Sequence, residues 1–88
     1  MYEWDEDKRS QNLRKHGVDF ATVEGFDWEN SIIFEDTREA YLEPRWVAFA
    51  PIGDRLFALV FTVRGEITRV ISLREATKKE RRLYVQEI

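Results

Sequence analysis

The residues best suited to chemistry lie between Arg64 and Tyr84, where basic side chains are concentrated. This stretch holds seven basic residues and three acidic ones, an excess of four positive charges. The basic residues are Arg64, Arg69, Arg74, Lys78, Lys79, Arg81 and Arg82. Such a local excess favours an anionic partner, and a phosphate backbone fits it best. The alternative is an ordinary solvated surface with unevenly distributed charge.

The charge of the whole chain is lopsided, although its net value is only −3. Residues 1–44 hold five basic and twelve acidic residues, hence −7, whereas residues 45–88 hold nine and five, hence +4. We therefore expect a polyanion to meet the protein on one side only.

The sequence gives little support for a metal site or for a membrane-spanning segment. The 88 residues include no cysteine and one histidine, His16, so no disulfide framework and no cysteine or histidine zinc site is expected. We expect no cofactor. No apolar run reaches the ~18 residues that a membrane span needs, and no leader pattern begins the chain, so a cytoplasmic protein is expected.

Two helices are predicted in the N-terminal third, and they must position His16. Asp5 offers an N-cap for a helix that runs to His16, and Gly17 offers its C-cap. A second short helix is predicted over residues 20–26, with Asp19 as its N-cap. Residues 2–4 are read either as a short edge strand or as a staple that packs against the first helix.

Four strands and a final helix are predicted to position the basic stretch. The strands are expected at residues 31–37, 45–50, 55–63 and 66–74. The third is apolar on both faces, which indicates a central strand, and Gly65 suits the tight turn that follows it. The last helix begins near Thr77, where Thr77 and Glu80 fit a capping box.

The order of these elements predicts one α+β domain over residues 1–88. We expect two N-terminal helices and one C-terminal helix packed on a twisted four-stranded antiparallel sheet.

The chain resembles the BrnT family of toxins, and the residues that carry the resemblance span most of its length. At the front they are Trp4, Asp5, Lys8, Asn12, Lys15, His16, Gly17, Val18 and Phe20. In the middle they are Phe26, Asp27, Glu35, Asp36 and Arg45. At the back they are Thr62, Arg64, Arg69, Val70, Ile71, Ser72, Arg74, Ala76, Glu80 and Tyr84.

The resemblance implies a RelE-like fold, with helices on one face of the sheet. It implies a toxin of a type II toxin–antitoxin system, an endoribonuclease or mRNA interferase that cleaves messenger RNA and arrests translation. It also implies a BrnA-like DNA-binding antitoxin that neutralises the toxin and lets the complex repress its own operon. A homodimer within a toxin–antitoxin heterotetramer is compatible with an apolar sheet face larger than the helices can cover.

RNA cleavage without a metal needs three groups. A base takes the proton of the 2′-hydroxyl, an acid protonates the 5′-oxygen, and cations stabilise the phosphorane. The candidates for catalysis are Arg64, Arg74, His16, Lys15 and Tyr84, and the candidates for RNA binding are Lys78, Lys79, Arg81, Arg82 and Arg69. Which residue is the base and which the acid stays open.

Each candidate also has an ordinary structural explanation. Arg64 and Arg74 could be surface arginines paired with carboxylates, and their strand ends lie on the order of 30 Å apart at ~3.4 Å per residue unless a bulge shortens the gap. His16 could simply interact with the end of its helix. Tyr84 could be a core residue. The alternative function is therefore a non-catalytic module that binds an antitoxin or nucleic acid.

Overall fold

The first helix begins and ends where its capping residues predict. The computed structural model describes residues 1–88, and helix α1 spans Glu6–His16. The Asp5 carboxylate accepts hydrogen bonds from the backbone N–H groups of the first turn. Gly17 adopts a φ of 70°, which suits glycine, and its N–H bonds the Leu13 carbonyl. The end of α1, and with it His16, is therefore held in a defined place.

The second predicted helix is a 3₁₀ helix and not an α-helix. Residues Phe20–Gly25 form a 3₁₀ helix, η1, and Trp28–Asn30 form a second one, η2. Asp19 is the N-cap of η1 as predicted, since its carboxylate accepts from the Ala21 N–H. Six residues that end in a glycine are too few for a stable α-helix, and 3₁₀ geometry is common in such short pieces.

The prediction of four antiparallel strands is also wrong, because the sheet has five strands and is mixed. Strand β1 (Tyr2–Glu3) runs parallel to β5 (Ile67–Glu75), with Glu3 opposite Arg69. The others are β2 (Ile32–Glu35), β3 (Trp46–Ile52) and β4 (Arg55–Arg64), all paired antiparallel, in the order β1-β5-β4-β3-β2. Two residues cannot show an alternating pattern, so the pairing of β1 had no periodic signal.

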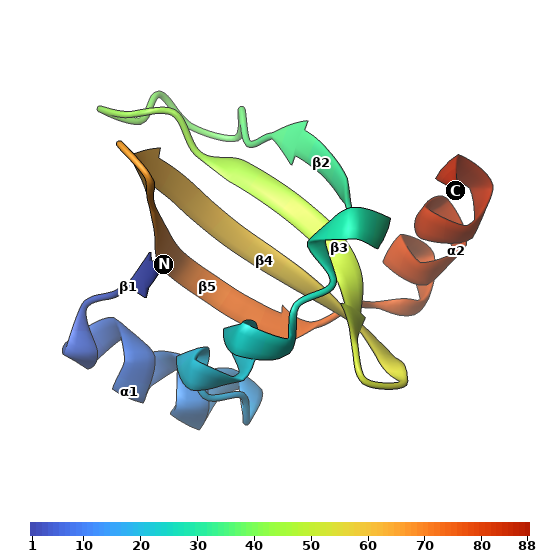
Figure 1. Ribbon diagram of the computed structural model, residues 1–88, viewed down its shortest axis with the longest axis horizontal. Coiled ribbons are helices and arrows are strands. Elements are labelled where there is room, and N and C mark those ends of the chain that lie inside the picture. The colour runs from blue at the N-terminus through green and yellow to red at the C-terminus, as the bar shows by residue number, and fades with distance from the viewer.

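One face of the sheet carries the main core. Phe20 and Val23 of η1 pack on alternate residues of the central strands, including Leu59 and Leu73, and all four are fully buried. Figure 1 shows α1 and the 3₁₀ segments beside the sheet. Burial of these side chains stabilises the fold by about 2 kcal/mol each. This side of the molecule is closed by the chain itself.

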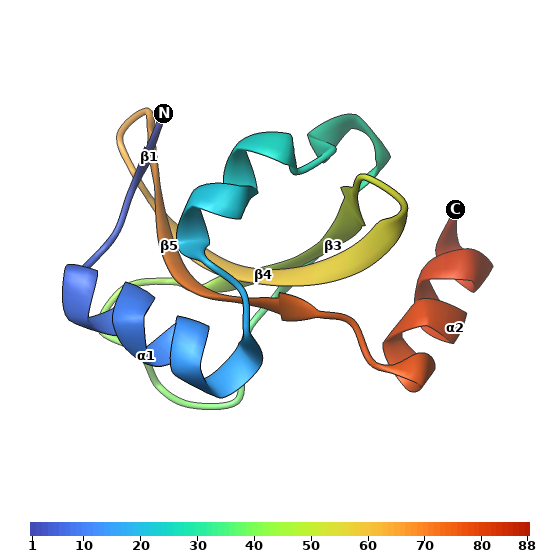
Figure 2. The same ribbon diagram turned by 90° about the horizontal axis from the view of Figure 1, so that it is seen from below.

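The opposite face is covered only at one end, by α2 (Lys78–Glu87). Tyr84 of α2 packs with Phe49 and Ala58, which point away from the main core. The expectation that all helices share one face is therefore wrong, and Figure 2 shows α1 and α2 well separated. The predicted capping box is confirmed: Thr77 accepts from the Glu80 N–H, and the Glu80 carboxylate accepts from the Thr77 N–H. The rest of this face stays open.

A bulge interrupts the pairing of β4 with β5 on the open face. Val60 lies opposite Ser72 but Phe61 lies opposite Val70, so Ile71 is an extra residue. Bulges bend a strand and redirect its side chains. Without this one, Leu73 and Val70 could not both point into the same core.

No helix in the structure has the length and apolar character needed to cross a membrane.

Candidate active site

The open face carries a cleft of about 470 Å³ between the end of α1 and the start of α2. Side chains of β3, β4 and β5 line its floor, among them Val47, Val60 and Ser72. Its charged and titratable residues are Lys15, His16, Glu35, Asp36, Arg38, Arg45, Arg74 and Glu80. Four of them are cations and three are carboxylates, so the cleft is slightly positive when His16 is neutral. We call this hollow the cleft.

Arg74 is fixed in the cleft by Glu80. Its Nη1 and Nη2 donate to the two carboxylate oxygens of Glu80 at 2.7 and 2.8 Å, and Nη1 also reaches the Glu75 carbonyl at 3.4 Å. This bidentate pair joins the end of β5 to the first turn of α2. The side chain of Arg74 is 30% exposed, so the pair does not seal it from solvent.

The bonds of Arg74 leave one edge of its guanidinium free. Arginine has five N–H donors, and Glu80 with the Glu75 carbonyl takes three of them. The remaining donors, on Nε and Nη2, lie on one edge of the group. Arg9 uses that same edge to bind the Asp19 carboxylate at 2.8 and 2.7 Å. Arg74 can therefore bind an anion bidentately without releasing Glu80.

Glu80 is unsuited to donate a proton at neutral pH. The hydrogen bonds from Arg74 lower the pKa of the Glu80 carboxyl to about 2, and the Thr77 N–H adds to the effect. The same pair raises the pKa of Arg74. Glu80 is thus a carboxylate throughout the physiological range, and its role in the cleft is to hold Arg74.

His16 and Lys15 enter the cleft from the end of α1. Burial lowers the pKa of His16 below 6.5, and the positive charges of Lys15 and Arg74 lower it further. His16 is therefore mostly neutral at pH 7 and can accept a proton. His16 and Arg74 line the same cleft.

Asn12 anchors the helix end that carries these two residues. Its side-chain amide donates to the carbonyls of Val18 at 2.9 Å and Leu73 at 2.7 Å, and it accepts from the Leu73 N–H at 3.2 Å. It thereby bonds the free edge of β5 much as another strand would. This contact lies one turn before His16 and sets its position relative to Arg74.

Arg64 and Arg69 lie at the other end of the same sheet face. Arg74 is opposite Ala58 on β4, and Arg64 lies six residues further along that strand, about 20 Å away at ~3.4 Å per residue. Arg64 bonds Glu43 at 2.7 Å, and Arg69 bonds Glu3 at 2.7 Å. The structure therefore does not bring Arg64 together with His16, Lys15 and Arg74.

Tyr84 lies outside the cleft, with 8% of its surface exposed. Its hydroxyl donates to the Asn30 carbonyl and ties α2 to η2.

We expect Tyr84→Phe to lower the free energy of unfolding by about 1 kcal/mol, because one buried hydrogen bond is lost. Chemical denaturation measures this. A catalytic role for Tyr84 predicts something different: a loss of cleavage at unchanged stability.

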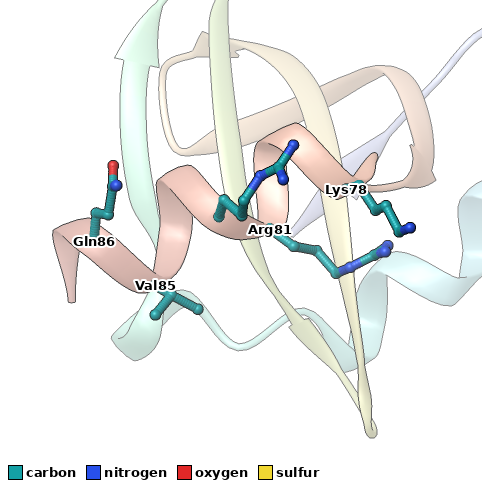
Figure 3. Close-up of a pocket in the computed structure, with 5 residues that line it drawn as sticks. Lys78, Arg81, Val85 and Gln86 are labelled. Carbon is teal, nitrogen blue, oxygen red and sulfur yellow. The ribbon is translucent and has the colours of Figure 1, made fainter.

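The basic residues of α2 surround two shallow hollows rather than the cleft. One is lined by α2 alone, through Lys78, Arg81, Arg82, Val85 and Gln86, and Figure 3 shows these side chains on the helix. The other lies between α2 and the sheet and is lined by Lys79, Arg82 and Leu83, together with Phe49 and Glu80. Since Phe49 and Glu80 also line the cleft, this second hollow adjoins it.

The cleft residues to which sequence reasoning assigned no role include Asp36, Arg38 and Arg45. Asp36 and Arg45 were noted only as part of the family pattern. Arg38 was not singled out, although a carboxylate and an arginine two residues apart in a loop often pair. The structure holds no group of three or more histidine, cysteine, aspartate or glutamate side chains placed to bind a metal.

A comparison with protein families identifies the class of the protein. Residues 4–80 match the family described as ribonuclease toxins of type II toxin–antitoxin systems. This family is BrnT, and because the match covers most of the chain, the chain belongs to it. The resemblance seen in the sequence is thus confirmed. Members of a type II system have a protein antitoxin as partner. No curated protein sequence matches the chain.

Proposed function

We propose that this protein is a metal-independent endoribonuclease that cleaves messenger RNA in the cleft and so arrests translation. One observation carries the proposal: a histidine, whose pKa is lowered by burial, and an arginine with a free anion-binding edge line the same cleft. These are the two kinds of group that cleavage by the 2′-hydroxyl needs most. Family membership supports the ribonuclease activity itself.

His16 is the general base of this reaction. Its neutral imidazole accepts the proton of the 2′-hydroxyl, the 2′-oxygen forms a bond to phosphorus, and the bond from phosphorus to the 5′-oxygen breaks. The leaving 5′-oxygen takes a proton from the Lys15 ammonium, which lines the cleft beside His16. The products are a 2′,3′-cyclic phosphate and a 5′-hydroxyl end.

Arg74 stabilises the charge that develops on phosphorus. Its free Nε and Nη2 donors match two phosphate oxygens, and Glu80 keeps the guanidinium from turning away. Because this geometry exists before RNA binds, little reorganisation is needed at the moment of reaction. Glu80 acts here as a positioning residue.

Further contacts hold the RNA outside the cleft. Lys79 and Arg82 flank the hollow that adjoins it, and Lys78 and Arg81 continue the basic side of α2. Arg64 and Arg69 contact the RNA further along the open face. Catalytic roles for Arg64 and Tyr84 remain predictions.

A direct test uses purified protein, a fluorescent RNA and an excess of chelator. We expect cleavage to fragments that carry 2′,3′-cyclic phosphates, which mass spectrometry detects. Intact RNA at every concentration of a folded protein would contradict the proposal.

The pH dependence of cleavage tests the role of His16. The pKa of His16 lies below 6.5, so protonation removes the base only as the pH falls below that value, and cleavage should fall with it. We expect His16→Gln to cleave about a hundredfold more slowly at pH 7 and to lose this acidic limb. Single-turnover rates of both proteins from acidic to neutral pH measure the effect. An unchanged limb in the variant would assign it to another group.

The antitoxin in this proposal is a BrnA-like DNA-binding protein that neutralises the toxin and represses the shared operon. The family supports a protein antitoxin. A toxin dimer within a heterotetramer stays a prediction. Co-expression with the candidate antitoxin should restore growth, and the purified complex should bind operator DNA.

A non-catalytic binding module is the second candidate. The ion pairs that occupy Arg64 and Arg74 favour it, since a surface arginine bound to a carboxylate needs no catalytic explanation. Expression separates the two functions. A ribonuclease toxin arrests growth of its host and loses this effect in the His16→Gln variant, whereas a binding module does neither.

A further inference from the structure

The segment from Asp36 to Arg45 forms one wall of the cleft without being a helix or a strand. Its two ends are joined, because the Asp36 N–H donates to the Arg45 carbonyl at 2.8 Å. Thr62 of β4 holds it from below, with a 2.6 Å hydrogen bond from its hydroxyl to the Pro44 carbonyl. Loops that a rigid scaffold holds in place often carry binding residues. We call this segment the loop.

The buried carboxylate of Asp36 accepts its hydrogen bonds mainly from an exposed arginine, Arg38. Its side chain is 3% exposed, whereas that of Arg38 is 72% exposed. Arg38 donates to it through Nε at 2.8 Å and Nη2 at 2.7 Å, and the Tyr41 hydroxyl donates at 3.3 Å. These bonds lower the pKa of Asp36 to about 2, with Arg38 as the largest cause.

Burial of this charge is poorly explained by stability alone. Desolvation of a carboxylate is costly, and a partner that remains in water returns little of that cost. What the arrangement achieves is the placement of Arg38. A long, flexible and solvent-exposed side chain is held at the mouth of the cleft by a carboxylate that cannot move.

Arg38 and Arg74 present complementary edges to the cleft. Arg38 uses its Nε edge for Asp36, so its outer Nη donors stay free, whereas Arg74 uses its outer edge for Glu80 and keeps its Nε edge. Both line the cleft, and the charge of Arg38 acts on the pKa of Arg74. The two arginines therefore face one ligand from different walls. Single-stranded RNA offers them successive phosphates.

Tyr41 and Arg45 offer a stacking surface next to Arg38. The Arg45 guanidinium lies over the Tyr41 ring, 4.2 Å from its centroid. Both line a separate hollow of about 280 Å³ within the loop, together with the carboxylates of Glu35, Asp36, Glu39 and Glu43. Arg38 pairs with Asp36 and Arg64 pairs with Glu43. The hollow is still net acidic, which disfavours a phosphate but does not repel an uncharged base. Planar guanidinium and aromatic groups are the surfaces on which unpaired RNA bases stack.

We propose that the loop binds one nucleotide of the RNA beside the cleaved bond: Arg38 binds its phosphate, and Tyr41 with Arg45 stacks its base. This inference rests on the proposed function in taking RNA as the ligand. It gives Asp36 the role of a positioning residue that holds Arg38 in place.

The experiment measures binding of a short, fluorescent 2′-O-methyl RNA, which cannot be cleaved. We expect Arg38→Ala to weaken binding about tenfold and to reduce the salt dependence by about one ion. We expect Tyr41→Ala to weaken binding about tenfold with an unchanged salt dependence, and Tyr41→Trp to restore it. Arg55→Ala is the matched control, because Arg55 is an exposed arginine paired with Glu75 outside the cleft.

A base-free ligand separates stacking from phosphate binding. With an abasic 2′-O-methyl strand, Arg38→Ala should still weaken binding, whereas Tyr41→Ala should have no effect. Asp36→Asn should resemble Arg38→Ala, and thermal melts of every variant exclude loss of the fold as the cause.

The outcomes separate this inference from the proposed function. If the unmodified RNA is not cleaved but both variants lose affinity, the loop site stands and the proposed reaction fails. If wild-type protein cleaves RNA and both variants bind like wild type, the loop site is overturned and the reaction stands. Unchanged RNA binding with weakened antitoxin binding would reassign the loop to the protein partner and overturn the proposal.

Discussion

Replacement of Arg74 by alanine is expected to slow RNA cleavage about a thousandfold, because it removes the bidentate donor that stabilises the reacting phosphate in the proposed reaction. Arg74 is held by two bonds to Glu80 and keeps an edge free for phosphate. His16 remains a base in this variant, because burial and Lys15, the two larger causes of its lowered pKa, are unchanged. The loss should therefore lie in stabilisation of the phosphorane.

Single-turnover cleavage of a labelled RNA measures this effect, with two further variants beside it. Arg74→Lys keeps the positive charge but loses the planar fork of the guanidinium. We therefore expect its cleavage rate to lie much closer to that of Arg74→Ala than to that of wild type. Arg55→Ala should cleave like wild type. A rate for Arg74→Ala within about threefold of wild type would move the chemistry away from the cleft, and Arg64 would then be the next residue to test.

Folding must be checked in the Arg74 variant, because it leaves the Glu80 carboxylate without its main partner. The Glu80 side chain is 21% exposed and keeps its bond from the Thr77 N–H. Water and the Thr77 N–H therefore provide hydrogen bonds to the Glu80 carboxylate when Arg74 is absent. Circular dichroism and a thermal melt should show a folded protein, and the double variant Arg74→Ala/Glu80→Gln should be no more active than the single one.

Asn12→Ala is expected to lower the free energy of unfolding by about 2–4 kcal/mol, a large share of what so small a domain possesses. Asn12 is 7% exposed and makes three hydrogen bonds to the backbone. Alanine removes all three and leaves the N–H and carbonyl of Leu73 and the carbonyl of Val18 without these partners. The cavity left by the amide adds to the cost.

Urea denaturation measures the change, and Gln11→Ala is the control. Gln11 is the exposed neighbour of Asn12 on the same helix, so its truncation should change stability by less than about 0.5 kcal/mol. Cleavage should suffer in the Asn12 variant even where it is folded, since α1 no longer holds His16 against β5. Equal stability of the two variants would show that solvent replaces the amide without cost.

The local signals in the sequence were sufficient for the elements with their own capping or turn chemistry. Asp5 and Gly17 bound α1, Thr77 and Glu80 begin α2, and Gly65 adopts the positive φ expected of the last hairpin. The errors concern pairing and packing. The partner of β1 is decided by pairing between residues far apart in the chain, Tyr2 with Thr68 and Glu3 with Arg69. The face that α2 covers is decided by the packing of Tyr84 on Phe49 and Ala58 of the sheet.

The candidate site was predictable to a similar extent. His16, Lys15 and Arg74 could be chosen by residue type, and the structure brings these three to one cleft. The separation of ~30 Å expected for Arg64 and Arg74 was longer than the six residues found along β4. The hairpin turn takes no part in the pairing, since Arg64 lies opposite Ile67, and the bulge adds one unpaired residue to β5. Asp36 and Arg38 could not be found from type alone. The role proposed for this pair depends on the burial of the Asp36 side chain and the exposure of the Arg38 side chain, and both are determined by the folded structure.

The two borders of the sheet differ in what they offer to another polypeptide. On the β5 side, the outermost strand is β1, which has only two residues, and the Asn12 amide bonds the backbone of Leu73 further along β5, so this border offers too little free backbone for a further strand. On the other side, β2 has no outer neighbour, and Ile33 and Phe34 are exposed along it. A sheet that can grow at one border only cannot stack into an endless ribbon. Two copies joined through β2 would close on themselves, so self-assembly of this toxin by strand addition must stop at a pair.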